Sequence, residues 1–160
     1  MLLTIITINL NNAAGLEKTM QSVASQTNSD FEYVVIDGAS SDDSVKVIQK
    51  YAGQFGPRLK WVSEPDNGIY QAMNKGIRLS SGRFIQILNS GDSLAQADVI
   101  ERMLLELETL GEPSILYGNM IKCFPDGRRV VDKSFAGEEI TLFGMYTGTL
   151  NHDPAFVSRI

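Results

Sequence analysis

Apolar residues in the first half of the chain alternate between short continuous runs and runs with helical spacing. The continuous runs are rich in β-branched residues, which predicts strands covered on both faces, at residues 2–8, 31–37, 59–64 and 83–88. Between them, apolar residues recur every three or four positions, which predicts helices that begin after Asn11 or Asn12, at Asp42 or Asp43, and at Asp66 or Asn67. This alternation with short links predicts an α/β fold whose mainly parallel, Rossmann-like sheet has helices on both faces.

The second half of the chain has a different pattern. Residues 97–110 form an amphipathic helical pattern, with Glu101, Glu106 and Glu108 on the solvent side. Two further strand-like runs, residues 114–124 and 128–135, flank a Pro-Asp-Gly turn and predict a hairpin. We therefore expect one domain over residues 1–160, with a parallel half followed by a mixed half that contains a small antiparallel excursion.

Composition narrows the class of protein. A formal charge of −5 argues against a general nucleic-acid binder, because phosphate neutralisation needs a surplus of Lys and Arg. The single cysteine, Cys123, fits a reducing compartment and is expected to be a small, half-buried hydrophobic residue. No apolar run approaches the roughly 20 residues of a membrane span, and the first residues lack the basic segment of a signal peptide. A cytoplasmic location is expected.

Small polar residues gather where the predicted strands end. In open α/β sheets, ligands bind outside the carboxyl ends of the strands, so Asp37, Asp66 and Asp92 should converge on one edge. Helix capping accounts well for Asp42 or Asp43. It accounts poorly for Asp37 and Asp92, which directly follow apolar strands and have small neighbours that leave room for a ligand.

The sequence excludes two common ligand motifs at this edge. It contains no phosphate-binding G-x-x-x-x-G-K-[ST] loop, and the segment after the first strand lacks the G-x-G-x-x-G of a dinucleotide site. A carboxylate at a strand end can instead accept hydrogen bonds from a base or a ribose, and another can hold a divalent cation that neutralises a diphosphate. The pattern favours activation of a nucleoside diphosphate as a leaving group.

Three segments together resemble family 2 glycosyltransferases with the GT-A fold, of the bacterial polysaccharide-biosynthesis type. They are IITINLNN, SVASQTNSDFEYVVIDGASSDDS and EPDNGIYQAMNKGIRLSSGRFIQILNSGD, and the likeness runs from Leu3 to about Arg159. The resemblance implies a nucleotide-binding half at residues 1–92 and the start of an acceptor-side half at residues 93–160. It implies transfer, with inversion, of a sugar from a nucleotide-sugar donor, first of all a UDP-sugar, to a glycan or lipid-linked acceptor in cell-surface polysaccharide biosynthesis.

The resemblance also implies site residues. Those implied to bind the nucleotide sugar are Thr7, Asn9, Leu10, Asn11, Asp37, Gly38, Asp66, Gly68, Asn89 and Ser90. Asp37 would accept from uracil or ribose, Leu10 replaces the usual aromatic residue, and Gly38 stands where the second Asp of a pair is usual. Asn74 and Lys75 match the same family stretch, although helix solubility and a cation in the last helical turn explain them equally well.

The stretch Asn89-Ser90-Gly91-Asp92 occupies the place of the family's D-x-D motif. Asp92 keeps the last carboxylate and is the expected ligand of Mg²⁺ or Mn²⁺, with diphosphate oxygens and water as further ligands. An inverting enzyme also needs a general base, which in the family lies well beyond the strand that residues 152–160 match. The base is therefore expected beyond Ile160, with Asp153 as a weaker candidate, and His152 is expected to contact the acceptor or the diphosphate.

These features leave other functions open. The chain is expected to be truncated at its C-terminus, which leaves a non-catalytic nucleotide-sugar-binding module or an inactive fragment as the main alternative. A nucleotidyltransferase would need a Gly-rich basic loop after the first strand, which residues 9–18 match poorly. Peripheral contact with the inner face of the membrane is one further expectation. The surface around residues 142–156 is expected to be mobile or covered in a dimer.

Overall fold

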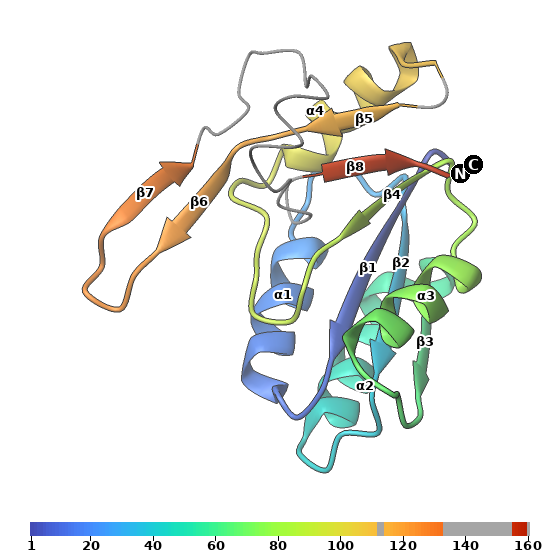
Figure 1. Cartoon of the computed structure of the whole chain (residues 1–160), viewed down its shortest axis with the longest axis vertical. Coiled ribbons are helices and arrows are strands. Elements are labelled where there is room, and N and C mark those ends of the chain that lie inside the picture. Colours follow the sequence, from blue (N-terminus) through green and yellow to red (C-terminus); the bar gives the residue numbers. More distant parts are fainter. Residues whose placement is uncertain (112–113, 133–154, 160) are drawn as a thin grey trace.

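The computed structural model describes residues 1–111, 114–132 and 155–159 (Figure 1). Six strands form one sheet in the order β3-β2-β1-β4-β8-β5, and two form a separate sheet, β6-β7. The strands are β1 (Leu3–Asn9), β2 (Glu32–Asp37), β3 (Leu59–Ser63), β4 (Phe84–Ile87), β5 (Ile115–Tyr117), β6 (Met120–Cys123), β7 (Arg129–Asp132) and β8 (Ala155–Ser158). Strands β1 to β4 are parallel, and β8 runs antiparallel to both β4 and β5. The predicted mixed, mainly parallel sheet is confirmed.

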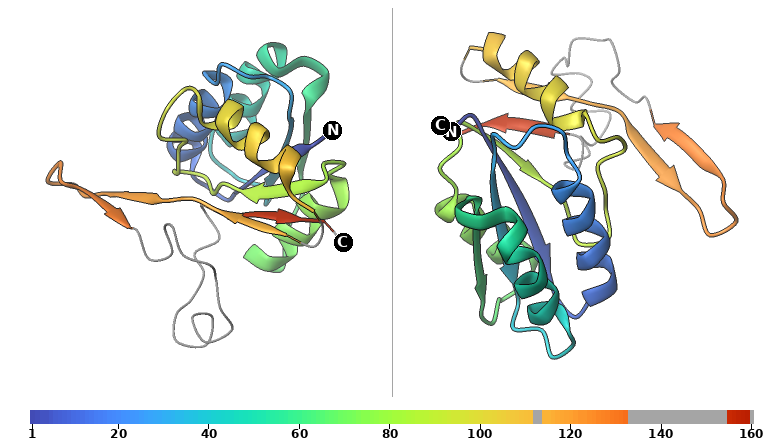
Figure 2. Two further views of the ribbon diagram at one scale, coloured as in Figure 1. Left: turned by 90° about the horizontal axis from the view of Figure 1, so that it is seen from above. Right: turned by 180° about the vertical axis from the view of Figure 1, so that it is seen from behind.

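Helices cover both faces of this sheet (Figure 2). They are α1 (Ala13–Ala24), α2 (Ser44–Phe55), α3 (Ile69–Leu79) and α4 (Val99–Thr109), with a short 3₁₀ turn, η1 (Gly56–Arg58), after α2. The side chains of β1 alternate between two cores. Ile5 packs with α1, α2 and α4, whereas Ile6 and Ile8 pack with α3. Helix α3 lies very close to the sheet, because a Cβ on Gly76 would come within 2.4 Å of Ile6 Cγ2. Within the described ranges, no helix is long and apolar enough to cross a membrane.

The starts of the helices agree only in part with the sequence. The side chain of Asn12 caps α1 by accepting from the Gly15 amide at 3.1 Å, as predicted. The prediction that Asp66 or Asn67 caps α3 is wrong. Gly68 occupies the N-cap with a φ of 109°, and the Asp66 side chain is ion-paired to Lys75 further along the helix.

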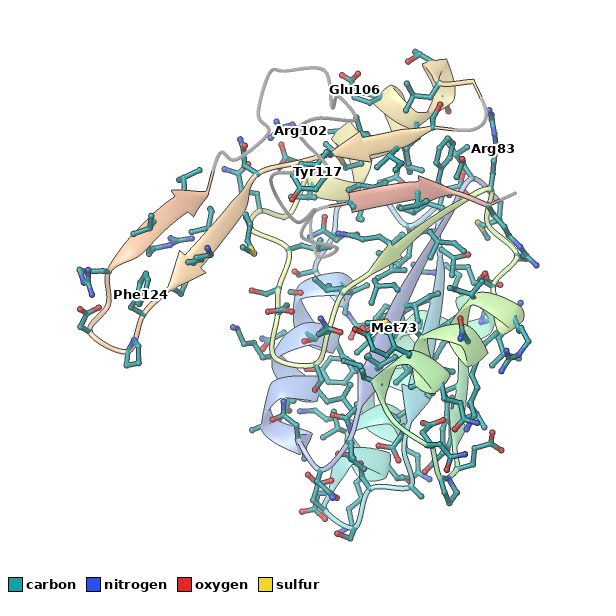
Figure 3. The ribbon with its side chains drawn as sticks, in the orientation of Figure 1. Met73, Arg83, Arg102, Glu106, Tyr117 and Phe124 are labelled. Carbon is teal, nitrogen blue, oxygen red and sulfur yellow. The ribbon has the colours of Figure 1, made fainter. Side chains whose placement is uncertain are left out.

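The predicted hairpin forms, but it begins later than expected. The run expected as one strand over residues 114–124 divides at Gly118 and Asn119, so that β5 joins the main sheet and β6 pairs with β7. Figures 1 and 2 show this hairpin projecting from the body of the protein, and Figure 3 shows Phe124 at its far end. Cys123 lies on the hairpin and is exposed, so the prediction of a half-buried cysteine is wrong. Most of the surface expected around residues 142–156, together with His152 and Asp153, falls outside the described residues, whereas Ala155 and Phe156 are buried in β8.

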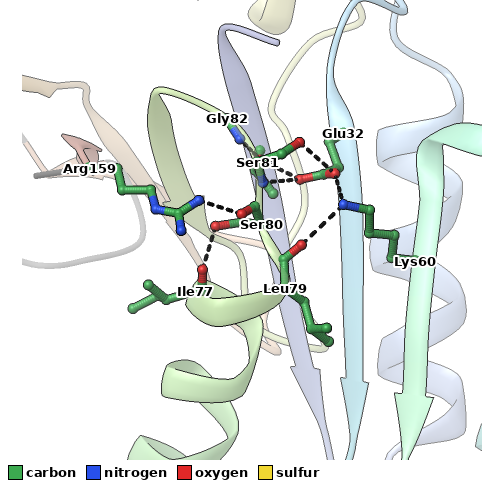
Figure 4. Close-up of polar contacts among 9 residues, drawn as sticks. Glu32, Lys60, Ile77, Leu79, Ser80, Ser81, Gly82 and Arg159 are labelled. Carbon is green, nitrogen blue, oxygen red and sulfur yellow. Dashed lines mark hydrogen bonds and ion pairs between the residues drawn. The ribbon is translucent and has the colours of Figure 1, made fainter.

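A buried glutamate joins the elements at the amino edge of the sheet (Figure 4). The Glu32 carboxylate accepts from Thr4 Oγ1 at 2.8 Å and from the Ser81 amide at 2.7 Å, and pairs with Lys60 Nζ at 2.5 Å. Lys60 also donates to the Leu79 carbonyl oxygen, at 3.1 Å. Burial raises the pKa of Glu32, but Lys60 and the hydroxyl and amide donors together lower it more, so the pKa lies below its ordinary value.

This network predicts a pH-dependent contribution to stability. Glu32→Gln should lower the free energy of unfolding by about 1–3 kcal/mol at pH 7, because it removes a buried negative charge that accepts several hydrogen bonds and pairs with Lys60. A carboxylate with a depressed pKa stabilises the fold above its unfolded pKa and loses that effect as the pH falls. The difference between wild type and Glu32→Gln in urea unfolding should therefore shrink below the ordinary pKa of 4.5. Glu17→Gln, at a more exposed carboxylate paired with Lys50, is the control. An undiminished difference at pH 3.5 would contradict this account.

Candidate functional site

A pocket of about 320 Å³ lies at the carboxyl ends of β1 and β4, between the loop after β2 and the start of α3. This volume is at the lower end of the range of small-molecule sites. The residues that line it are Ile8, Asn9, Leu10, Asn12, Gly38, Asp66, Gly68, Ile69, Ala72, Asn89 and Ser90. Seven of these lie among the ten residues expected to bind a nucleotide sugar. Ile8, Asn12, Ile69 and Ala72 were missed, because an apolar wall looks like core in a sequence and Asn12 looked like a helix cap.

The three remaining expected residues support the pocket from outside it. Thr7 is fully buried, and its hydroxyl is 2.9 Å from the hydroxyl of Tyr33. Asn11 has a φ of 50°, and its side chain accepts from the Ser41 amide at 2.8 Å, which joins the loop after β1 to the loop after β2. Asp37 is the third. Thr7 therefore joins β1 to β2, Asn11 and Asp37 hold loops around the pocket, and none of the three is among the residues that line it.

Asp37 is fully buried at the end of β2. Its Oδ1 accepts from Asn9 Nδ2 at 2.8 Å and from the Ser40 hydroxyl, and its Oδ2 accepts from the Ser40 amide at 3.0 Å and from Ser63 Oγ at 2.6 Å. Burial raises the pKa of Asp37, but these donors together lower it more, so the carboxyl group has a pKa below its ordinary value. The carboxylate that was expected to accept from uracil or ribose therefore already has donors within the protein, which serines 3 and 26 positions away in the sequence supply.

Asn9 carries this arrangement across to β4. The side-chain nitrogen of Asn9, Nδ2, donates to Asp37 and also to Ser44 Oγ at 2.9 Å. The side-chain oxygen, Oδ1, accepts from Ser90 Oγ at 2.8 Å. Asn9 therefore connects the end of β2 with the loop after β4. A change in the position of Asp37 would be transmitted through Asn9 to Ser90, in the wall of the pocket.

The loop of residues 89–92 is fastened to α1 as well. Thr19 Oγ1 donates to the Asp92 carbonyl oxygen at 2.7 Å and accepts from the Gly91 amide at 2.9 Å, and Lys18 Nζ donates to the Gly91 carbonyl oxygen at 2.7 Å. Gly91 has a φ of 107°, a conformation that favours glycine. Asp92 is exposed at the end of this loop. Among the residues that the structure describes, no group of three or more His, Cys, Asp or Glu side chains is placed to hold a metal ion.

Asp66 differs from the other two aspartates. Its side chain is 8% exposed, its Oδ1 lies 2.5 Å from Lys75 Nζ, and its Oδ2 has no partner within the described part of the chain. Lys75 lies before the last turn of α3 and contacts the loop that precedes the helix, so it is no C-terminal cation. Hydrogen bonds from Lys75 to Asp66 and Glu64 raise the pKa of Lys75. Asn74 is exposed, as expected of a solubilising position.

Comparison with known proteins gives this site a context. Residues 4–157 match the family Glycosyl transferase family 2. The chain is 36% identical over 118 residues to a PGL/p-HBAD biosynthesis glycosyltransferase of Mycobacterium tuberculosis, covering 74% of this chain and 46% of that protein. It is 33% identical over 89 residues to chondroitin synthase of Escherichia coli, covering 56% of this chain and 13% of that protein. The chain thus spans about half the length, or less, of these curated relatives.

Solved structures share the fold. Residues 1–349 of TarS from S. aureus, in complex with UDP-GlcNAc, superpose with a TM-score of 0.79 at 21% identity, covering 99% of this chain and 45% of that one. The mannosyltransferase PcManGT from Pyrobaculum calidifontis, in complex with GDP-Man and Mn²⁺, gives a TM-score of 0.62 at 22% identity, covering 71% and 34%. At these identities the likeness concerns the fold. Together with the match over residues 4–157, it shows that the chain belongs to glycosyl transferase family 2 and has the GT-A fold.

Proposed function

We propose that this chain, chiefly through residues 1–92, binds a nucleotide sugar and supplies the donor-binding part of a glycosyltransferase. The observation that carries the proposal is the pocket at the carboxyl ends of β1 and β4, whose residues join an apolar wall to a few polar groups, as small-molecule sites do. A UDP-sugar is the first candidate, which is supported by the structural neighbour solved with UDP-GlcNAc.

Different residues of the pocket suit different parts of such a donor. Leu10, Gly38 and Ile69 give the pocket apolar surface that suits a base, whereas Asn12 and Ser90 give it polar groups, and Ser90 belongs to the loop that carries Asp92. The sugar and diphosphate would then lie toward Asp92. Transfer with inversion to a glycan or lipid-linked acceptor, in cell-surface polysaccharide synthesis, completes the proposal. The relatives named for PGL/p-HBAD biosynthesis and as chondroitin synthase support it.

The residues around Asp92 offer a divalent cation one carboxylate ligand, so the remaining ligands must come from the substrate and water. Mg²⁺ is commonly held by one or two carboxylates together with substrate phosphates, so one protein carboxylate is enough when a diphosphate is bound. When bound, Mg²⁺ or Mn²⁺ would neutralise the charge that develops on the leaving diphosphate. Thr19 and Lys18 fix the backbone of the loop that carries Asp92. The neighbour solved with GDP-Man and Mn²⁺ supports a metal-dependent site.

The acceptor side of the reaction involves residues outside the described ranges. His152 is proposed to contact the acceptor or diphosphate, and Asp153 is one candidate for the general base, while the longer relatives have further sequence in which the base could lie. We expect the protein to work in the cytoplasm, at the inner face of the membrane if the acceptor is lipid-linked. Turnover in the full-length enzyme, against binding alone in this chain, would separate the transferase from a binding module.

The proposal predicts stabilisation by nucleotide diphosphates. A nucleotide that binds the folded state at a hundred times its Kd should stabilise it by about 2.7 kcal/mol, which raises the Tm of a chain of this size by about 5–10 °C. Thermal-shift measurements with UDP-, GDP- and dTDP-sugars, with and without Mg²⁺ or Mn²⁺, test this expectation. Free galactose and glucose are the controls. An unchanged Tm with every nucleotide would overturn the proposed function.

The metal part of the proposal makes a separate prediction. Mn²⁺ should strengthen UDP binding several-fold in wild type, and Asp92→Asn should remove that gain, because a hard cation prefers a charged oxygen ligand. Uridine offers the ion no phosphate oxygens and should show no metal dependence in either protein. Asp98→Asn, at a nearby carboxylate that begins α4, is the matched control. Equal Mn²⁺ enhancement of UDP binding in wild type and Asp92→Asn, measured by calorimetry, would exclude Asp92 as a ligand.

The buried network predicts that Asp37 acts through stability. Asp37→Ala leaves the donors of Asn9, Ser40 and Ser63 without their acceptor, so the free energy of unfolding should fall by about 2–4 kcal/mol. UDP affinity should fall with it, because Asn9 then no longer holds Ser90 in place. Asp43→Ala, which removes an exposed carboxylate paired with Lys46, is the control. Urea unfolding and UDP titration of each variant provide the measurement. Full stability with lost UDP binding would instead indicate direct contact by Asp37.

A further inference from the structure

Asp66 presents a buried carboxylate oxygen that no group in the described part of the chain satisfies. The side chain is more than nine-tenths buried and lines the pocket, its Oδ1 is ion-paired, and its Oδ2 lacks a hydrogen-bond donor. A buried charged acceptor without a donor destabilises a fold, and such atoms are rare in native proteins. An unsatisfied atom of this kind in the wall of a pocket indicates that a ligand supplies the donor.

Lys75 fixes which oxygen of Asp66 is available. Lys75 Nζ forms ion pairs with Asp66 Oδ1 at 2.5 Å and with Glu64 Oε1 at 2.9 Å, and it donates to the Pro65 carbonyl oxygen at 3.0 Å. These three contacts hold the loop before α3 against the helix. They leave Asp66 with one acceptor atom for a ligand.

The pocket that Asp66 lines also contains a glycine and two exposed apolar side chains. A Cβ on Gly38 would lie 3.6 Å from Asp66 Oδ2 and 3.2 Å from Leu10 Cδ1, so the absence of a side chain at Gly38 keeps this end of the pocket open. Leu10 is 63% exposed and Ile69 is 52% exposed, and both line the pocket. Because Leu10 is so exposed, it can change rotamer and admit a ring against Gly38. A planar ring with an N–H on its edge would satisfy Asp66 and cover both apolar side chains.

We propose that Asp66 Oδ2 is the acceptor that reads the base of the donor nucleotide, and that it selects uracil through its N3–H. This inference rests on the proposed function and adds the residue that determines the base. Uracil offers one N–H between two carbonyl groups, which suits one free carboxylate oxygen. Guanine offers N1–H and an amino group side by side and needs two acceptors, but Lys75 occupies Oδ1. Cytosine presents a lone pair at N3, which the carboxylate would repel.

Asp66→Asn tests the proposal, because it should change the affinity for UDP relative to that for CDP. We expect wild type to bind UDP about 10- to 100-fold more tightly than CDP, since a hydrogen bond to a charged group is worth that ratio. In the variant, Lys75 should retain the amide oxygen, so that the amide N–H₂ replaces Oδ2 and donates to N3 of cytosine. The UDP-to-CDP ratio should then fall to about one or reverse. A merely structural role for Asp66 would weaken both nucleotides equally and leave the ratio unchanged, which would overturn the proposal.

A ligand-side measurement needs no variant. UDP methylated at N3 lacks the N–H donor, and wild type should bind it at least about tenfold more weakly than UDP. Equal binding of the two, or tighter binding of GDP than of UDP, would overturn the assignment of the base while leaving nucleotide-sugar binding intact. Failure of wild type to bind any nucleotide would instead overturn the proposed function and this inference together. Glu17→Gln, which removes a Lys-paired carboxylate outside the pocket, should keep the wild-type UDP-to-CDP ratio.

Discussion

The carboxylate of Asp37 lies at the end of a central strand, where water does not reach it, so the protein itself must supply its donors. Those donors come from the end of β1, the loop after β2 and the end of β3. Meeting this requirement places Asn9, and Asn9 in turn places Ser90. One buried charge therefore positions two polar residues of the pocket surface, Asn9 and Ser90, and joins the ends of the strands that carry the pocket.

A second buried carboxylate, at the other end of β2, also needs donors from the protein itself. Glu32 and Asp37 are the first and last residues of this strand, and both are buried. In the register of β1 and β2, Thr4 lies beside Glu32 and Asn9 beside Asp37, and both pairs are hydrogen-bonded. A slip of one residue would break both bonds and turn the side chains to the wrong faces, so the two carboxylates specify the register at a cost in desolvation. At the amino edge, the Glu32 network joins neighbouring elements of the sheet, and at the carboxyl edge the Asp37 network supports the pocket.

Sequence could predict the fold and the edge that carries the pocket, because both follow from local patterns. Buried parallel strands produce continuous apolar runs, and the carboxyl ends of such strands lie at one edge. It could not predict that Asp37 is saturated, since Ser63 belongs to another strand and only the folded chain brings it near. For the same reason Asp66 was expected to cap α3, although its partner is Lys75, nine positions later. The division at Gly118 and Asn119 could not be predicted either, because it depends on which strands pair with residues 115–117 and 120–123, and the local sequence does not specify those partners.

The three aspartates expected at this edge differ in their burial and in the contacts around them, and these differences support the roles proposed for them. Asp37 has donors on both oxygens and so has little to offer a ligand, which suits a support for the loops. Asp66 has a partner on one oxygen, which leaves a single acceptor with a fixed direction, as selection of one N–H requires. Asp92 is exposed on a loop whose backbone is held by Thr19, an arrangement that suits a hydrated cation. In the proposed site, one residue type would thus serve three roles at one edge, because burial and neighbouring donors set how each carboxylate can meet a substrate.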